Sequence, residues 1–140
     1  SKLFCIAILF ANGLIAFLLI SICSIEEFKN RWAKVRSSMK SSNIELLMVI
    51  SPTNINYLIG TPAKGYQEFE ALLFPIDSDP MVMMTRRSEV EMMNDYSLAD
   101  EVYGWGGQEP EDPIDALYNL MSEKNLLNKK IKSLIYLYHL

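Results

Sequence analysis

Apolar residues are distributed unevenly along this chain of 140 residues. Residues 3–24 carry no charged side chain, whereas the rest of the chain mixes apolar and charged positions as globular domains do. About 20 apolar residues in a helix are enough to cross the hydrocarbon core of a membrane. The pattern therefore predicts a hydrophobic leader over 1–24, ahead of a single domain over 25–140. The leader is interpreted as a membrane anchor or uncleaved signal, a cleaved signal, or an extension with neither role.

The first periodic segment of the globular part is helical. Apolar side chains at Phe28, Trp32, Val35 and Met39 recur every three or four residues, which predicts one apolar face on a helix that begins near Ile25. Acidic residues come first and basic residues later, as suits a helix dipole. The helix either packs on a sheet with its basic side chains in solvent, or lies on a membrane surface.

Apolar runs of strand length follow. They predict strands over residues 46–50, 70–76, 81–85, 101–105 and 129–137. The run over 46–50 is continuously apolar, as expected of a strand that is buried on both faces. Because the next two runs are separated by the turn 77–80, they are expected to form a hairpin.

Two shorter helices are expected between these strands. One has Val90 and Met93 on its inner side, and the other begins with Asp112 as N-cap and Pro113 in its first turn. The residues expected to face the core from the latter helix are Ile114, Leu117, Leu120 and Met121. The elements together predict a single α/β domain, with a mixed sheet flanked by helices and preceded by a hydrophobic helix.

Residues 51–60 carry the most distinctive local pattern. Pro52 removes a backbone donor, and Asn54 is expected to cap a short helical turn over 55–58. Gly60 is expected to take the left-handed conformation that closes this turn.

Together with its neighbours, this segment resembles the N-terminal domain of the creatinase, prolidase and aminopeptidase P family, over about residues 25–131. The resemblance rests on Glu27-Phe28 with Arg31 and Arg36, on Ala71-Leu72-Leu73-Phe74, and on the motif residues Pro52, Asn54, Asn56, Tyr57 and Gly60. It implies a ribonuclease H-like fold, and a role in dimer contacts and in covering the active site of a partner domain. In that family, a separate C-terminal domain holds two divalent metal ions with two Asp, one His and two Glu.

The loop over 61–68 is the candidate for substrate contact. The resemblance aligns it with the creatinase segment that reaches toward the substrate, with Tyr66 at an aromatic position and Glu68 where creatinase has an arginine. Because Glu68 would repel a substrate carboxylate, peptidase or ectoine hydrolase relatives fit better than creatinase. The alternative is that this loop only connects two elements. Arg86 and Arg87 likewise either line a pocket or are ordinary surface charges.

Composition argues against several other classes. A net charge of −4 and a pI of about 5.0 do not suit a nucleic-acid partner, which would need clustered Lys and Arg. No catalytic residue and no metal site is expected in this chain, because its single histidine, His139, lies next to the last residue without partner carboxylates. Both cysteines, Cys5 and Cys23, fall in the leader, so the globular part offers no thiol chemistry.

The expected function is that of a non-catalytic N-terminal domain, for dimerisation and substrate covering, of a creatinase or Xaa-Pro peptidase-like hydrolase that is truncated before its catalytic domain. The chain is expected to be inactive alone and to pair with a second copy or with the missing catalytic domain. The alternative is a stand-alone binding or regulatory module that pairs with a full-length homologue. The hydrophobic segment over 3–24 predicts membrane association, and the alternative is a cytoplasmic location, as is usual for the family.

Overall fold

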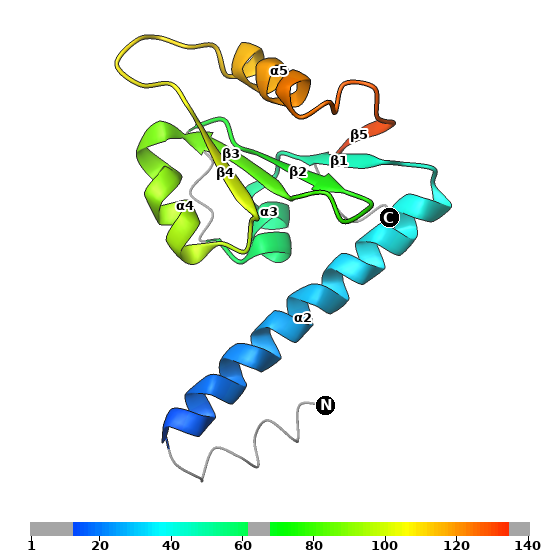
Figure 1. Cartoon of the computed structure of the whole chain (residues 1–140), viewed down its shortest axis with the longest axis vertical. Helices are drawn as coiled ribbons and strands as arrows, with labels where there is room; N and C mark the ends of the chain where they lie inside the picture. Colours follow the sequence, from blue (N-terminus) through cyan, green and yellow to red (C-terminus); the bar gives the residue numbers. More distant parts are fainter. Residues whose placement is uncertain (1–12, 62–67, 135–140) are drawn as a thin grey trace. The chain divides into compact units, whose positions relative to one another are not determined.

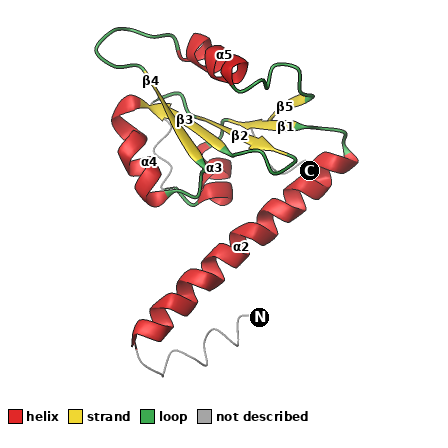
Figure 2. Cartoon of the chain, viewed as in Figure 1, coloured by secondary structure: helices red, strands yellow, loops and turns green. Residues whose placement is uncertain are grey.

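The computed structural model describes residues 13–61 and 68–134, in which helices and strands alternate except at residues 71–86, where two strands follow one another (Figure 1, Figure 2). The elements are α2 (Gly13–Ser41), β1 (Leu46–Val49), α3 (Pro52–Ile59), β2 (Ala71–Pro75), β3 (Val82–Arg86), the single 3-10 turn η1 (Arg87–Glu89), α4 (Val90–Tyr96), β4 (Glu101–Trp105), α5 (Pro113–Glu123) and β5 (Ile131–Leu134). The chain divides into two compact units, Ser1–Lys34 and Val35–Leu140.

Helix α2 runs without a break through the predicted boundary at Ser24. After Gly13, neither proline nor glycine occurs before Ser41, so no residue there interrupts the helix. The expectation of a separate hydrophobic helix is therefore corrected, because residues 13–24 belong to the same helix as the amphipathic segment. In the part of the chain that the structure describes, no helix is long and apolar enough to cross a membrane. Residues 3–12 of the predicted leader lie outside that part, and membrane association stays a prediction.

The strands form one five-stranded mixed sheet in the order β4-β3-β2-β1-β5. The inner pairs β1·β2 and β2·β3 are antiparallel, and the outer pairs β3·β4 and β1·β5 are parallel. The predicted hairpin is confirmed, with Leu72 opposite Met83. The apolar run over 46–50 is confirmed as an interior strand, because β1 has a neighbour on each side. These pairings confirm the expected mixed α/β domain.

Side chains of the strands alternate between two covered faces. Helix α5 lies on one side of the sheet, and α3 and α4 lie on the other (Figure 1). The core on the α5 side consists of Leu46, Ala71, Leu73, Val82, Met84, Trp105, Ala116, Leu117, Leu120, Met121 and Leu126. The prediction for α5 was wrong at Ile114, which is 58% exposed. With 3.6 residues per turn, the buried face is centred between Leu117 and Leu120, and Ile114 falls just outside its border, beside Met121.

The two predicted helix starts have different outcomes. Asp112 caps α5 as predicted, since its Oδ1 accepts a hydrogen bond from Ile114 N at 2.7 Å. Asn54, by contrast, does not cap α3, which begins at Pro52, three residues earlier than predicted, with Ser51 as N-cap. The physical reason is Pro52, whose fixed φ and missing N–H suit the first position of a helix.

The predicted close of α3 is confirmed. Gly60 has φ 72° and ψ 21°, and its N–H donates to Asn56 O at 2.9 Å. A residue with a side chain rarely adopts this conformation. The glycine therefore ends the helix and turns the chain toward residue 61.

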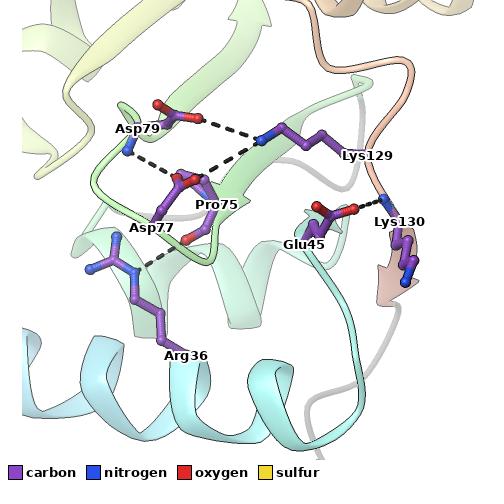
Figure 3. A network of polar contacts seen from close by, with 7 residues as sticks. All are labelled: Arg36, Glu45, Pro75, Asp77, Asp79, Lys129 and Lys130. Atoms are coloured by element: carbon purple, nitrogen blue, oxygen red, sulfur yellow. Dashed lines mark hydrogen bonds and ion pairs between the residues drawn. The ribbon is translucent and has the colours of Figure 1, made fainter.

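Polar contacts attach the segment before β5 to the other strands (Figure 3). Glu45 Oε2 accepts a hydrogen bond from Lys130 N at 2.8 Å. Lys129 Nζ lies 4.0 Å from a carboxylate oxygen of both Asp77 and Asp79, in the turn between β2 and β3. The final strand thus starts at Ile131, two residues later than predicted, and residues 135–137 of the prediction lie outside the described residues.

Arg36 joins the end of α2 to the same turn region (Figure 3). Its Nε donates to Pro75 O at 3.2 Å, and its guanidinium lies 5.0 Å from the centre of the Phe74 ring. The family-like residue Arg36 therefore has a structural role at the end of β2.

Candidate functional site

The candidate site lies where the parallel strands β3 and β4 end. Their last residues, Arg86 and Trp105, are partners in the register. In sheets with parallel strands, ligands are commonly bound beyond the carboxyl ends of the strands, where loops supply functional groups. Polar side chains from the start of β2 and from the loop after β4 meet at this edge.

Arg86 is held between an aromatic ring and a carboxylate. Its guanidinium carbon lies 4.8 Å from the centre of the Trp105 ring, and its Nε lies 3.8 Å from Glu68 Oε2. Trp105 is itself fixed, because it is buried and its Nε1 donates to Phe69 O at 2.9 Å. A cation over an indole face is attracted by the ring quadrupole. The arrangement therefore orients a positive charge at the end of the sheet.

Arg87 has a different role from its neighbour. Its Nε donates to Gly106 O at 2.7 Å, while Gly106 N donates to Glu111 Oε2 at 2.6 Å. The bond from Arg87 attaches the loop after β4 to the turn that follows β3, and the bond to Glu111 holds the loop on itself. Arg87 therefore holds this loop, a role that differs from both alternatives that the sequence left open, pocket lining and ordinary surface charge.

Glu70 is the buried charged group of the site. Only 6% of its surface is exposed, and Thr85 Oγ1 donates to its Oε1 at 3.2 Å. The other oxygen, Oε2, has no hydrogen-bond partner among the described residues. Loss of solvation on burial raises the pKa of Glu70, the bond from Thr85 opposes this rise, and the negative charge of Glu89 adds to it.

The predicted motif residues lie in and after α3 and are not part of this constellation. Pro52 starts the helix, Asn54 is buried in it, and Asn56 supplies the carbonyl that Gly60 binds. Tyr57 is partly exposed on the same helix. The structure thus gives Pro52, Asn56 and Gly60 roles in shaping the helix, and functional roles for the motif stay predictions.

The predicted substrate loop is described at its two ends. Thr61 is buried and its Oγ1 donates to Met93 Sδ at 3.2 Å, and at the other end Glu68 is exposed beside Arg86. Tyr66 lies outside the described residues. The structure therefore brings one predicted site residue, Glu68, to the candidate site.

A metal site would require several His, Cys, Asp or Glu side chains to lie close together. Within residues 25–61 and 68–133, no three His, Cys, Asp or Glu side chains are grouped so that they could hold a metal ion. His139 lies outside those ranges. The side chains described do not fit the two metal ions of the family, and no step through a metal is derived for this chain.

Sequence reasoning missed Glu70, Thr85 and Trp105 as members of one site. Glu70 was placed correctly at the start of an apolar strand, and a lone carboxylate opening such a strand is the signal that was available. The hairpin register brings it opposite Thr85, one step beyond the pair Ala71 and Met84. That register depends on the turn, which sequence patterns define poorly.

Comparison with known proteins gives one curated relative and several solved structures of the same fold. Over 53 residues the chain is 38% identical to the uncharacterized hydrolase/peptidase y4tM of Sinorhizobium fredii (strain NBRC 101917 / NGR234), a match that covers 38% of this chain and 14% of that protein. The chain therefore matches only a small share of the relative's length.

Two solved structures illustrate the fold. The N-terminal domain of an Xaa-Pro dipeptidase from Lactobacillus brevis matches with a TM-score of 0.62 and 16% identity, covering 74% of this chain and 75% of that one. The creatinase/prolidase N-terminal domain of an X-Pro dipeptidase from Streptococcus pyogenes matches with a TM-score of 0.57 and 15% identity, covering 75% and 93%. At these identities the likeness shows the fold alone.

The sequence also matches a family as a whole. Residues 31–131 match the family model described as Creatinase/Prolidase N-terminal domain, which confirms the resemblance seen in the sequence. The match takes in the sheet from β1 to the start of β5, including Glu68, Arg86 and Trp105. This chain therefore belongs to the Creatinase/Prolidase N-terminal domain family.

Proposed function

We propose that this chain serves as the non-catalytic N-terminal domain of an Xaa-Pro peptidase-like, metal-dependent hydrolase. The observation that carries the proposal is the family match over residues 31–131, together with the mixed sheet that this chain shares with N-terminal domains of Xaa-Pro dipeptidases. The name of the curated relative, a hydrolase/peptidase, supports the same reaction class. In this proposal the metal ions and the hydrolytic groups belong to a catalytic domain, and this chain contributes contacts.

The first proposed contact is with a second subunit or with the catalytic domain. Helix α5 presents Ile114 and Tyr118, which are 58% and 61% exposed and lie four residues apart, on one side of the helix. Tyrosine is enriched at protein interfaces because it combines a large apolar surface with a hydroxyl group. These side chains support a contact surface on α5.

The second proposed contact is with the substrate. The loop that begins at Thr61 returns to the sheet at Glu68, next to Arg86. Tyr66 and Glu68 are its proposed contact residues, with Tyr66 offering an aromatic face. In this arrangement the domain covers the substrate while the chemistry takes place elsewhere.

A hydrolysis assay tests the non-catalytic role. The purified chain, supplied with Mn²⁺ and an Xaa-Pro dipeptide, is expected to release no proline. An N-terminally truncated form of y4tM with the same metal and substrate, which supplies a catalytic domain, is expected to become more active when the chain is added. Metal-dependent release of proline by the chain alone would contradict the proposal.

Light scattering during size-exclusion chromatography tests the contact surface. The chain is expected to associate with itself or with truncated y4tM, and Tyr118→Ser is expected to weaken that association. Asn119→Ala, an exposed change on another side of the same helix, is the matched control. Association with intact y4tM would instead favour the stand-alone module, a regulatory one if the activity of y4tM changes and a binding one if it does not.

A further inference from the structure

We propose that the guanidinium of Arg86 is a binding site for the carboxylate of a small-molecule ligand, and that Glu68 occupies this site when no ligand is bound. The site itself is argued from the contacts of Arg86. That the ligand is the end of a short peptide rests on the proposed function.

The side chain of Arg86 is already oriented before any ligand binds. Arg86 ends β3, so its backbone is held by the sheet, and its guanidinium stacks on the buried Trp105 ring at 4.8 Å. The ring cannot turn away without breaking the hydrogen bond from Trp105 Nε1 to Phe69 O. An arginine that is already ordered loses less conformational entropy when a ligand binds.

The guanidinium of Arg86 also has N–H donors that remain available to a ligand. A guanidinium has five N–H donors arranged as a planar fork that matches a carboxylate. Among the described residues, the polar contact of Arg86 is with Glu68, and the 3.8 Å from Nε to Oε2 is too long for a hydrogen bond. The fork of Arg86 therefore has donors to offer to a ligand.

Two other arginines of the sheet domain provide the contrast. Arg36 Nε donates to Pro75 O at 3.2 Å and Arg87 Nε donates to Gly106 O at 2.7 Å. Both use the guanidinium to hold the chain's own carbonyl groups. Arg86 donates no hydrogen bond to any described residue, which sets it apart as a recognition group.

A glycine, Gly106, lies beside the guanidinium of Arg86. A Cβ atom added at Gly106 would lie 3.0 Å from Arg86 Nη1. Because residue 106 is a glycine, no side chain stands on that side of the nitrogen, and the backbone of Gly106 is held by Arg87 at its O and by Glu111 at its N. A carboxylate oxygen can therefore approach Nη1 past the glycine.

The ion pair between Glu68 and Arg86 is exposed and easily displaced. The side chains of Arg86 and Glu68 are 38% and 52% exposed, and ion pairs that are this exposed contribute little to stability. A ligand carboxylate that displaces Glu68 returns it to water at small cost. The sequence-based expectation that Glu68 repels a carboxylate is refined accordingly, because the glutamate competes with the ligand for Arg86 and does not exclude it.

The experiment is an NMR titration of the whole chain without metal. N-acetylglycine is the probe and N-acetylglycinamide, which lacks the carboxylate, is the control ligand. We expect N-acetylglycine to shift the Arg86 Nε–H and Trp105 Nε1–H signals in a saturable way, and the amide to leave them in place. Equal shifts with both ligands would overturn the proposal.

Three variants sharpen the test. Arg86→Gln is expected to weaken binding at least about tenfold, because charge-assisted hydrogen bonds are lost. Glu68→Gln is expected to tighten it about two- to fivefold, since the competitor is removed. Lys132→Gln removes the same charge from exposed β5 and is expected to change nothing.

Unchanged binding in Arg86→Gln would overturn the proposal, and so would unchanged or weaker binding in Glu68→Gln. Because Glu68 is exposed, that variant decides the question even if Arg86→Gln does not fold. The titration contains neither metal nor catalytic domain. A failure of the hydrolysis or association assays would therefore leave its result standing, and its own failure would leave theirs standing.

Discussion

The buried carboxyl group of Glu70 is expected to make the stability of the whole domain depend on pH. Burial raises its pKa above the ordinary value of 4.5, and the nearby charge of Glu89 acts in the same direction. The folded state therefore binds the proton more tightly than the unfolded chain does. This contribution to stability is fully present below the unfolded pKa and is lost as the pH rises through the folded pKa.

We expect Glu70→Gln to stabilise the domain at neutral pH. The substitution keeps an oxygen for Thr85 and removes the buried negative charge, so the free energy of unfolding should rise by about 1–3 kcal/mol near pH 7. The gain should shrink toward pH 4, where the wild-type carboxyl group is protonated. Urea unfolding followed by circular dichroism at both pH values measures this difference.

The half-exposed Glu68 supplies the control for that experiment. Glu68→Gln should change the free energy of unfolding by less than about 0.5 kcal/mol at either pH. A Glu70→Gln variant that is destabilised equally at both pH values would show that the buried carboxylate has a partner and causes no strain.

Gly104 provides a second prediction, from steric contact. A Cβ there would lie 2.6 Å from Val90 Cγ2 and 3.0 Å from Arg87 Cα, which belongs to the backbone and cannot rotate away. Gly104→Ala should therefore lower the free energy of unfolding by about 1–3 kcal/mol. Thermal unfolding measures the change.

Gly107 is the matched position. A Cβ at Gly107 would be 3.4 Å from Arg87 Nε, the flexible part of a side chain. Gly107→Ala should stay within about 0.5 kcal/mol of the wild type. Equal losses in both variants would show that backbone conformation, and not the contact with Val90 and Arg87, decides the effect.

At the scale of single residues, the sequence correctly predicted the features that depend on residues a few positions away in the chain. Gly60 and Asp112 were assigned correctly because a helix end needs a specific conformation or a specific acceptor within a few residues. Ile114 was placed wrongly because the border of a buried face depends on how a helix sits on the sheet. The contact of Glu68 with Arg86 joins a residue before β2 to the end of β3, and local pattern does not report it.

At the scale of elements, α5 is expected to depend on its N-cap. Asp112 Oδ1 accepts hydrogen bonds from Ile114 N at 2.7 Å and Asp115 N at 3.4 Å. Asp112→Ala should cost about 1 kcal/mol, whereas Asp112→Asn should cost a few tenths, because asparagine caps nearly as well. Chemical denaturation of both variants measures this, and equal losses would mean that charge at the helix start outweighs the cap.

The elements themselves were largely predictable, with errors at their ends. Strands β1 to β4 lie within two residues of the predicted ranges, since each is an apolar run bounded by turn residues. Helix α3 begins earlier than predicted because Pro52 was read as part of a turn. Helix α2 extends through the leader boundary because hydropathy changes there while helix propensity does not.

At the scale of the whole molecule, the core defines what can fold alone. Every buried apolar side chain among the described residues lies between Val35 and Leu126. A fragment of residues 35–140 is therefore expected to unfold in one cooperative transition in urea. A fragment of residues 1–128 lacks β5 and the contacts of Lys129 and Lys130, and should unfold at a lower urea concentration.

The comparison of the two fragments is informative in both directions. Loss of cooperativity in 35–140 would show that residues before Val35 complete the fold. Unchanged stability of 1–128 would show that β5 adds little to the sheet. The same fragments, followed by hydrogen exchange, would report which strands lose protection.

The strand order was the part that the sequence alone did not supply. Hairpin pairing is local, but the parallel pairs β3·β4 and β1·β5 join strands through helices and loops, and periodicity does not indicate which edge a strand takes. The order of elements predicted a mixed sheet flanked by helices, and the family resemblance implied helices on both of its sides. The register that brings Arg86 opposite Trp105 came from the structure.

The pairing of β5 with β1 has a consequence during synthesis. Lys130 binds Glu45 across 85 positions of the chain, and Leu46 pairs with Ile131 in the next step of the register. On the ribosome, β1 emerges long before its parallel neighbour has been translated. Its outer backbone groups then stay open to other nascent chains, as strand edges do until they are covered. Closing the sheet is therefore expected to be a late event in the folding of this domain, which can occur only after residues 131–134 have emerged.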